Sequence, residues 1–126
     1  MKDTPSRKQL GAAGEKAAAD FLKRRGYVIL RRRFQTRYGE VDIVARDGPV
    51  LCFIEVKTRT DLSFGPPAKA VTAAKKKRLA LSAQAFLTKK KLGDAPVRFD
   101  VVAVLAGAGG FEIDLFQGAF ENPFDF

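Results

Sequence analysis

Histidine and tryptophan are absent from the 126 residues of the sequence, which contains one cysteine and one methionine. Without histidine the chain lacks the commonest general base and a common zinc ligand, so carboxylate and lysine chemistry remain for any reaction. A single cysteine cannot form a disulfide within the chain and is typical of the reducing cytosol. We therefore expect a cytoplasmic protein, and we assign no chemistry to Cys52, which lies inside an apolar segment.

Long apolar segments are also missing. No apolar run approaches the roughly 20 residues that a membrane-spanning helix needs. The first residues are polar where a secretory signal would have an apolar core. We therefore expect no secretory signal and no membrane partner. A chain of this length is expected to form one domain, over residues 1–126.

Two apolar strands joined by a turn are expected over residues 40–57. Both are rich in Val, Ile and Phe, and Asp47-Gly48 between them is a strong two-residue turn sequence. With these two residues as the loop, Asp42 pairs with Phe53 on the facing strand. Side chains alternate with a period of two, so Asp42 then shares a face with Glu55. A bulge or a three-residue loop would separate the two carboxylates.

Ionised carboxylates on apolar strands are costly unless something offsets their lost hydration. Asp42 and Glu55 are therefore predicted to hold a divalent cation, Mg²⁺ or Mn²⁺, with waters completing its shell. A water molecule on such a cation becomes a usable nucleophile near neutral pH, and Lys57 could orient or deprotonate it. In the alternative interpretation, Glu55 and Lys57 lie at the solvent-facing end of a strand and pair with each other.

A helix is expected from about Ser6 to Arg25, with Gly26 as its stop. Glu15 does not belong with the other charges of this helix, because it lies within about 20° of Leu22 on the apolar face. Two interpretations stay open. Glu15 is either a carboxylate at the edge of the apolar face, bonded to a nearby arginine, or a ligand of a metal or water that reaches the sheet.

Positive charge is abundant, with 23 lysines and arginines against 14 acidic residues and a net charge of +9. Four arginines lie at the end of a strand expected over residues 27–34 and just beyond it, interleaved with Phe34 and Tyr38. A run of charge is often only a solvated face. Here it directly precedes the acidic stretch, which favours a polyanion that must approach those carboxylates. The four are Arg31, Arg32, Arg33 and Arg37.

After a turn-rich connection, Pro66-Pro67 are expected to open a second helix that ends near Lys90. Lys75 lies in the middle of its predicted buried stripe. A lysine there can snorkel outward, or it can meet a buried carboxylate or a substrate phosphate, which we favour. The apolar members of the stripe are Val71, Leu79, Ala83 and Phe86.

The last third of the chain is expected to add a buried strand over residues 98–105 and an edge strand over residues 111–116, joined by a glycine-rich turn. Arg98 and Asp100 share a face and are predicted to pair in a structural role. The phenylalanines near the end must pack on the same chain or on a second copy, so a homodimer is one expectation. They are Phe116, Phe120, Phe124 and Phe126.

Four motifs together span nearly the whole chain: Gly14-Glu15, Gly39-Glu40-Val41-Asp42, Phe53-Ile54-Glu55-Val56-Lys57-Thr58-Arg59 and Arg98-Phe99-Asp100-Val101-Val102. In this order they resemble the YraN-type family of small uncharacterised bacterial proteins. That family is similar to the archaeal Holliday-junction resolvases of the PD-(D/E)xK nuclease superfamily. The resemblance implies that Asp42, Glu55 and Lys57 match the catalytic trio of that superfamily, and that Glu15 matches the helix-borne acidic residue of the resolvases.

The order of elements predicts an α/β fold, a restriction-endonuclease-like sandwich with a mixed central sheet flanked by helices. We expect a Mg²⁺-dependent endonuclease that hydrolyses DNA, with branched DNA among its candidate substrates. The alternatives are a nucleic-acid-binding or assembly protein that keeps the fold without turnover, and a structural domain whose charge serves solubility. The expected catalytic residues are Glu15, Asp42, Glu55 and Lys57. The expected nucleic-acid contacts are Arg31, Arg32, Arg33, Arg37, Arg59 and Lys75.

Overall fold

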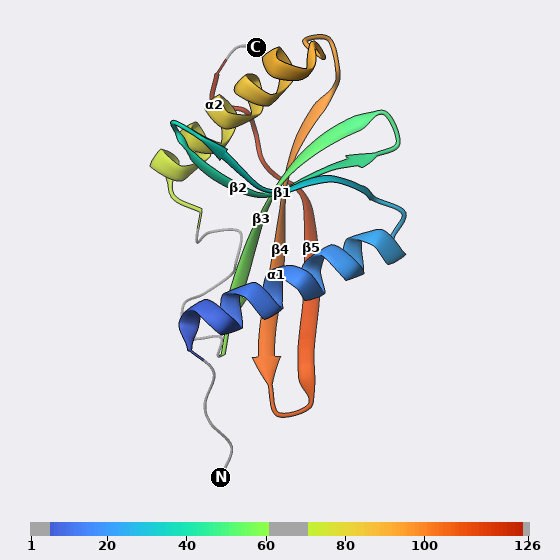
Figure 1. Cartoon of the computed structure of the whole chain (residues 1–126), viewed down its shortest axis with the longest axis vertical. Coiled ribbons are helices and arrows are strands. Elements are labelled where there is room, and N and C mark those ends of the chain that lie inside the picture. The colour runs from blue at the N-terminus through green and yellow to red at the C-terminus, as the bar shows by residue number, and fades with distance from the viewer. Residues whose placement is uncertain (1–5, 61–70, 125–126) are drawn as a thin grey trace.

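The computed structural model describes residues 6–60 and 71–124 and contains two helices and five strands (Figure 1). The five strands form one sheet in the order β1-β2-β3-β4-β5. Strands β3 and β4 are parallel and the other neighbours are antiparallel, so the predicted mixed sheet is confirmed. The elements are α1 (Arg7–Arg24), β1 (Val28–Thr36), β2 (Gly39–Asp47), β3 (Val50–Arg59), α2 (Ala73–Lys90), β4 (Val97–Gly107) and β5 (Gly110–Phe120).

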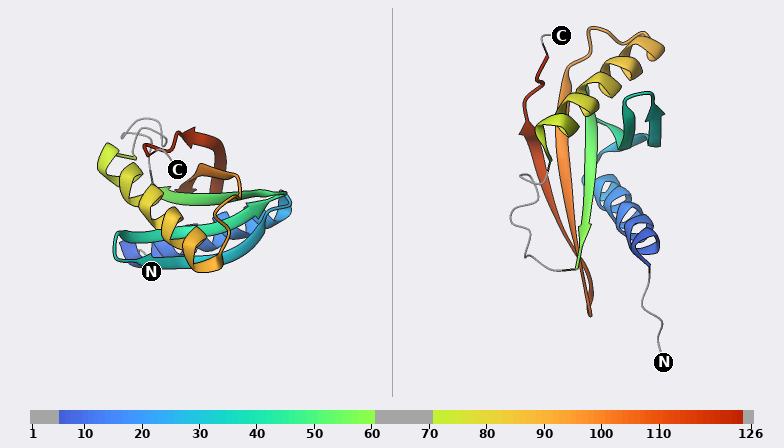
Figure 2. Two further views of the ribbon diagram at one scale, coloured as in Figure 1. Left: turned by 90° about the horizontal axis from the view of Figure 1, so that it is seen from above. Right: turned by 90° about the vertical axis from the view of Figure 1, so that its left-hand side faces the viewer.

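The two helices cover opposite faces of the sheet. Val44 and Phe53 pack in a cluster with Phe86 of α2, whereas Ile43 and Ile54, one position along each strand, pack in a second cluster with α1. Because neighbouring residues of a strand point to opposite faces, the helices form separate layers. Helix α2 lies near one end of the long axis of the molecule, whereas α1 crosses its middle region (Figures 1 and 2). The α/β sandwich that the sequence predicts is therefore confirmed.

Helix α2 connects the parallel strands β3 and β4, as a crossover helix does. It begins at Ala73, after the Thr72 side chain accepts a hydrogen bond from the backbone N–H of Lys75. This start is later than the predicted one at Pro66-Pro67, which lie outside the described residues together with the expected connection over residues 61–67. The predicted buried stripe is confirmed, because each of its four apolar members is at most 3% exposed: Val71, Leu79, Ala83 and Phe86.

Helix α1 agrees with its prediction. Ser6 caps it in a reciprocal pair with Gln9, in which each side chain bonds the backbone N–H of the other residue. Its buried residues include Ala18 and Leu22 of the predicted apolar face and also Glu15, which is 7% exposed. No helix within residues 6–60 and 71–124 is long and apolar enough to cross a membrane.

The hairpin of β2 and β3 is confirmed, but its register is two residues from the predicted one. Asp47 pairs with Val50, so the loop is Gly48-Pro49 and Val44 lies opposite Phe53. Gly48 has a φ of 59°, which suits the first loop position of a type II′ turn, and proline suits the second. A shift of two residues preserves the alternation of faces over the paired residues. Val41, however, packs in the same cluster as Val44 while Ile43 packs in the other, so the alternation breaks at Asp42. Continued by one pair, this register brings Asp42 opposite Glu55.

Strand β5 is an edge strand, as predicted, but it extends to Phe120. The ring of Phe120 stacks on Phe99 with 4.9 Å between centroids, so this phenylalanine packs on its own chain. Phe116 and Phe124 are each 37% exposed, and Phe126 lies outside the described residues. The homodimer stays a prediction.

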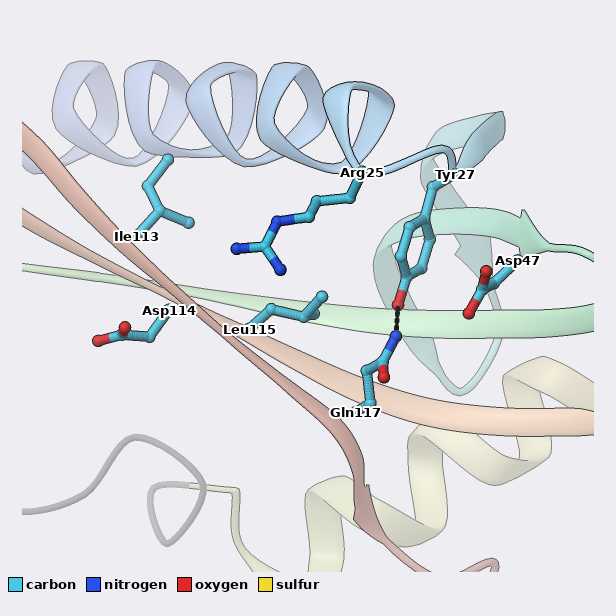
Figure 3. Close-up of a pocket in the computed structure, with 7 residues that line it drawn as sticks. All are labelled: Arg25, Tyr27, Asp47, Ile113, Asp114, Leu115 and Gln117. Carbon is cyan, nitrogen blue, oxygen red and sulfur yellow. Dashed lines mark hydrogen bonds between the residues drawn. The ribbon is translucent and has the colours of Figure 1, made fainter.

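A buried polar network joins β4 to the end of α1 and to β5, and Figure 3 shows part of it. Asp100 has no exposed surface and accepts hydrogen bonds from the Arg98 guanidinium at 2.9 Å, the Tyr27 hydroxyl at 3.0 Å and the Gly118 backbone N–H at 2.9 Å. Gln117 donates to the Tyr27 oxygen at 2.8 Å. Burial raises the pKa of Tyr27 to about 12. The predicted structural pair of Arg98 and Asp100 is therefore confirmed, within a larger network.

Candidate active site and metal centre

A cleft of about 400 Å³, lined by both acidic and basic side chains, opens between α1 and the ends of β2 and β3. It lies where the two strands part, because the recorded pairing stops at Ile43 and Ile54. Beyond that pair the Asp42 carboxylate accepts a hydrogen bond from the backbone N–H of Val56 at 2.8 Å, in place of a strand-to-strand bond. The described residues that line the cleft are Arg7, Lys8, Gly11, Ala12, Glu15, Arg33, Glu40, Asp42, Val56, Lys57 and Thr58.

Helix α1 approaches β3 closely at Gly14. A β-carbon at this position would lie 2.1 Å from the Thr58 hydroxyl oxygen, so an alanine would force the helix or the threonine to move. The close approach brings Glu15, the next residue, to the end of the sheet.

Three carboxylates converge there. Glu15 of α1 and Glu40 and Asp42 of β2 can each offer one oxygen, and these oxygens lie within 4.8 Å of one another. Glu40 was not among the candidate residues from the sequence. Its separation of two residues from Asp42 on a strand is the signal that could have identified it, because such residues share a face.

The structure confirms one of the two interpretations of Glu15, the carboxylate bonded to nearby arginines, and the other, a ligand of a metal or water, stays a prediction. One of its oxygens is 3.2 Å from Arg32 Nη2 and 3.5 Å from Arg33 Nε, so it is bonded to nearby arginines. It also lies among the converging carboxylates. Two of the arginines predicted to contact phosphate therefore neutralise Glu15.

Glu55 lies on β3 beside this cluster and is 4% exposed. Its Oε1 accepts a hydrogen bond from Lys75 Nζ at 2.8 Å and lies 3.9 Å from Lys57 Nζ. Its Oε2 is buried and has no hydrogen-bond partner among the described residues. Lys75 thus meets a buried carboxylate, one of the two contacts predicted for it. Lys57 lies near Glu55, as expected both for a catalytic pair and for a simple ion pair.

The charges of the site perturb one another. Burial, followed by the negative charge of Glu55, raises the pKa of Asp42 to about 7. Burial lowers the pKa of Lys57, and the positive charge of Lys75 contributes to that lowering. Burial acts in the same direction on Lys75, but Glu55 outweighs it and raises the pKa of Lys75. A carboxylate that resists ionisation beside an unpartnered buried oxygen is the environment that a divalent cation would stabilise.

This environment predicts how stability depends on pH. The folded-state pKa of Asp42, about 7, lies above its ordinary value of 3.8, so the folded state binds the proton more tightly. In chelator, the free energy of unfolding should therefore fall as pH rises from about 4 to about 7. Asp42→Asn is expected to flatten this slope and to stabilise the metal-free protein at pH 8 by on the order of 2 kcal/mol. Urea denaturation in EDTA at pH 5 and pH 8 measures the free energy of unfolding of the wild type and of Asp42→Asn.

The control for this prediction is Asp20→Asn, which changes an exposed acid paired with Lys16 on α1. It should keep the wild-type dependence on pH. An unchanged slope in Asp42→Asn would contradict the assignment.

The other predicted contacts are not among the described residues that line the cleft. Arg31 stacks over Phe34 with 5.8 Å to the ring centroid, and Arg37 stacks over Tyr38 at 5.0 Å and donates a hydrogen bond to its hydroxyl. Both arginines are exposed. Arg59, at the end of β3, lines a neighbouring opening together with Lys57. The structure therefore brings together the four expected catalytic residues and leaves Arg31 and Arg37 on the surface beyond them.

Comparison with known proteins identifies the family. Residues 14–104 match the model of the Uncharacterised protein family UPF0102. The chain is 46% identical to a UPF0102 protein of Geotalea uraniireducens over 121 residues, which is 95% of either chain. It is 47% identical to one of Symbiobacterium thermophilum over 114 residues, 90% of this chain and 97% of that one. The matched region contains every expected catalytic residue, and the chain belongs to UPF0102, the YraN-type family of small uncharacterised bacterial proteins.

Proposed function

We propose that this protein is a Mg²⁺-dependent nuclease that hydrolyses phosphodiester bonds of DNA. One observation supports this most directly: Glu55 has a buried oxygen without a hydrogen-bond partner among the described residues, beside Asp42 and within 3.9 Å of Lys57 at its other oxygen. An unsatisfied buried carboxylate oxygen is costly unless a cation or a donor completes it. Without metal, a protonated Asp42 can supply that donor, and a divalent cation would replace its proton.

The residues present fit a divalent cation. Asp42 and Glu55 would hold it, and Glu15 and Glu40 supply further carboxylates within reach. Oxygen ligands of this kind suit Mg²⁺ or Mn²⁺. When bound, the cation would activate a water molecule and neutralise charge on the phosphate.

The chain supplies the remaining parts of a hydrolysis. The oxygen of water forms a bond to phosphorus, one of the two ester P–O bonds breaks, and the departing oxygen takes up a proton. Lys57 lies at the cleft and is placed to orient this water. Because burial lowers the pKa of Lys57, its amine is neutral more often than that of an ordinary lysine and can accept the proton that water loses. Glu15, fixed by Arg32 and Arg33, lines the other side of the cleft.

DNA fits the charge of the protein and the groups around the cleft. The net charge is +9, and the cleft is lined by four basic side chains as well as three acidic ones. Arg59 lines the neighbouring opening, and the exposed Arg31 and Arg37 would extend the contact with phosphates beyond it. Branched DNA is the first substrate to test, since it is what the resemblance to the resolvases implies.

The test uses a four-way junction, a linear duplex and a single strand, each with Mg²⁺, Mn²⁺ or EDTA. We expect cleavage of at least one substrate with metal and of none with EDTA. Salt-sensitive binding without cleavage under any condition would instead favour the nucleic-acid-binding or assembly protein. If the protein neither binds nor cleaves any of these substrates, the remaining hypothesis is a structural domain whose charge serves solubility.

Binding has its own prediction. Replacing Arg37 by glutamine is expected to weaken DNA binding about fivefold and to reduce the slope of log affinity against log salt by about 1, because one phosphate contact is lost. Fluorescence anisotropy in EDTA at several salt concentrations measures both. Arg46→Gln is the matched control, because Arg46 is equally exposed but lies at the opposite end of β2. Equal losses in the two variants would show that net charge alone drives binding.

A further inference from the structure

We infer that Lys75 is a built-in counter-cation of Glu55 that opposes metal binding and thereby sets the metal affinity of the site. The inference rests on the proposed function, since it concerns the same carboxylate. It assigns Lys75 a role different from the phosphate contact that the sequence also allowed.

The geometry supports a direct role. Lys75 Nζ lies 2.8 Å from Glu55 Oε1, the distance of a strong charged hydrogen bond. Lys57 Nζ is 3.9 Å from the same oxygen, outside hydrogen-bond distance. Lys75 is therefore the cation that holds this carboxylate in the absence of metal. It bonds Oε1, whereas Oε2 has no hydrogen-bond partner among the described residues.

The position of Lys75 on its helix makes this contact a feature of the fold. It lies in the first turn of α2, and its backbone N–H is held by the Thr72 cap at 3.2 Å. Its side chain crosses from the α2 layer to β3 and is 31% exposed, so the ammonium group has a route to solvent. It can therefore turn away from Glu55 without unfolding the helix, as a lysine with several rotatable bonds does.

Electrostatics gives the direction of the effect. A divalent cation on Oε2 of Glu55 would lie a few ångströms from the ammonium group, and two cations at that distance repel each other. The metal must overcome this repulsion or displace Lys75 from Glu55. Removing the ammonium group is therefore expected to strengthen metal binding.

The experiment measures Mn²⁺ affinity without DNA, by isothermal titration calorimetry and by the electron paramagnetic resonance of free Mn²⁺. Lys75→Met is expected to bind Mn²⁺ about tenfold more tightly than the wild type. Lys75→Arg, which keeps the charge, should bind like the wild type. Lys76→Met is the matched control: it removes the same charge one residue away, where Nζ lies over the Phe120 ring rather than on Glu55, and should change the affinity at most twofold.

Thermal unfolding gives a second readout. Without metal, Lys75→Met should melt at a lower temperature than the wild type, because Glu55 loses its direct partner. Saturating Mn²⁺ should raise its melting temperature by more than it raises that of the wild type. If Lys75→Met does not fold, Lys75→Gln, which removes the charge but keeps a hydrogen-bond donor, takes its place with the same expected direction.

Unchanged or weaker Mn²⁺ affinity in the folded, uncharged variant overturns the inference. If that variant instead loses DNA affinity at constant Mn²⁺ affinity, Lys75 contacts phosphate, as the sequence also allowed. Failure of the proposed function looks different, because a wild type that binds no Mn²⁺, or binds it and cuts no DNA, would exclude the nuclease whatever Lys75 does.

Discussion

Replacing Lys57 by methionine is expected to lower the rate of Mg²⁺-dependent DNA cleavage by about 10³-fold, within the range that a positioned proton-transfer group contributes. The side chain lies at the cleft with its ammonium group 3.9 Å from Glu55, and burial lowers its pKa. Methionine fills a similar volume and can neither orient water nor accept its proton. Single-turnover cleavage with excess enzyme measures the loss.

Two further measurements identify the cause of that loss. Lys57→Met should bind Mn²⁺ at least as tightly as the wild type, because a lysine is not a metal ligand, whereas Asp42→Asn should lose both cleavage and Mn²⁺ affinity. Lys77→Met, which changes an exposed lysine of α2, should cleave at the wild-type rate. A Lys57→Met rate within a few-fold of the wild type would exclude Lys57 from the reaction.

The second large effect concerns stability. Asp100→Ala is expected to lower the free energy of unfolding by about 4 kcal/mol. The substitution removes the carboxylate that accepts hydrogen bonds from Arg98, Tyr27 and the Gly118 N–H. Asp100 is fully buried, so water cannot replace the lost carboxylate without entering the core. Chemical denaturation followed by far-ultraviolet circular dichroism measures the change.

Asp47→Ala is the comparison for Asp100→Ala. Asp47 accepts a hydrogen bond from the same guanidinium at 2.9 Å, but its side chain is 36% exposed. Its loss should cost at most about 1 kcal/mol, as for other exposed ion pairs. If the two variants lose equal stability, burial is not what makes the Asp100 contact important. Either folded variant should cleave DNA at the wild-type rate, because neither Asp47 nor Asp100 is among the described residues that line the cleft.

The sequence predicted the elements well because their signals are local. The apolar periodicity of α1 and the runs of Val, Ile and Phe in β2 and β3 depend only on neighbouring residues. The same periodicity predicted that Glu15 faces the core side of its helix and that Lys75 lies within a buried stripe. The hairpin register was wrong because Asp-Gly and Gly-Pro both form two-residue turns, and strand pairing decided between them.

The parts of the site that sequence could not predict depend on long side chains and on distant contacts. Nothing local indicates that Arg32 and Arg33 turn back to Glu15, or that Lys75 reaches Glu55 across 20 positions of the chain. Lysine and arginine have many rotamers, so the partner within reach decides which one they adopt. Glu40 was missed for a different reason. Only the approach of α1 gives it a role beside Glu15 and Asp42.

The separation of β2 from β3 beyond Ile43 has a consequence for how the two faces of the sheet influence each other. A continuous sheet separates its two helical layers. Here Asp42 interacts with Glu15 of α1 and also with Glu55, whose hydrogen-bond partner Lys75 belongs to α2. Asp42 therefore links charges that the two helical layers carry. A change of charge at Lys75, on the α2 side, is therefore expected to influence the carboxylates of the cleft on the α1 side.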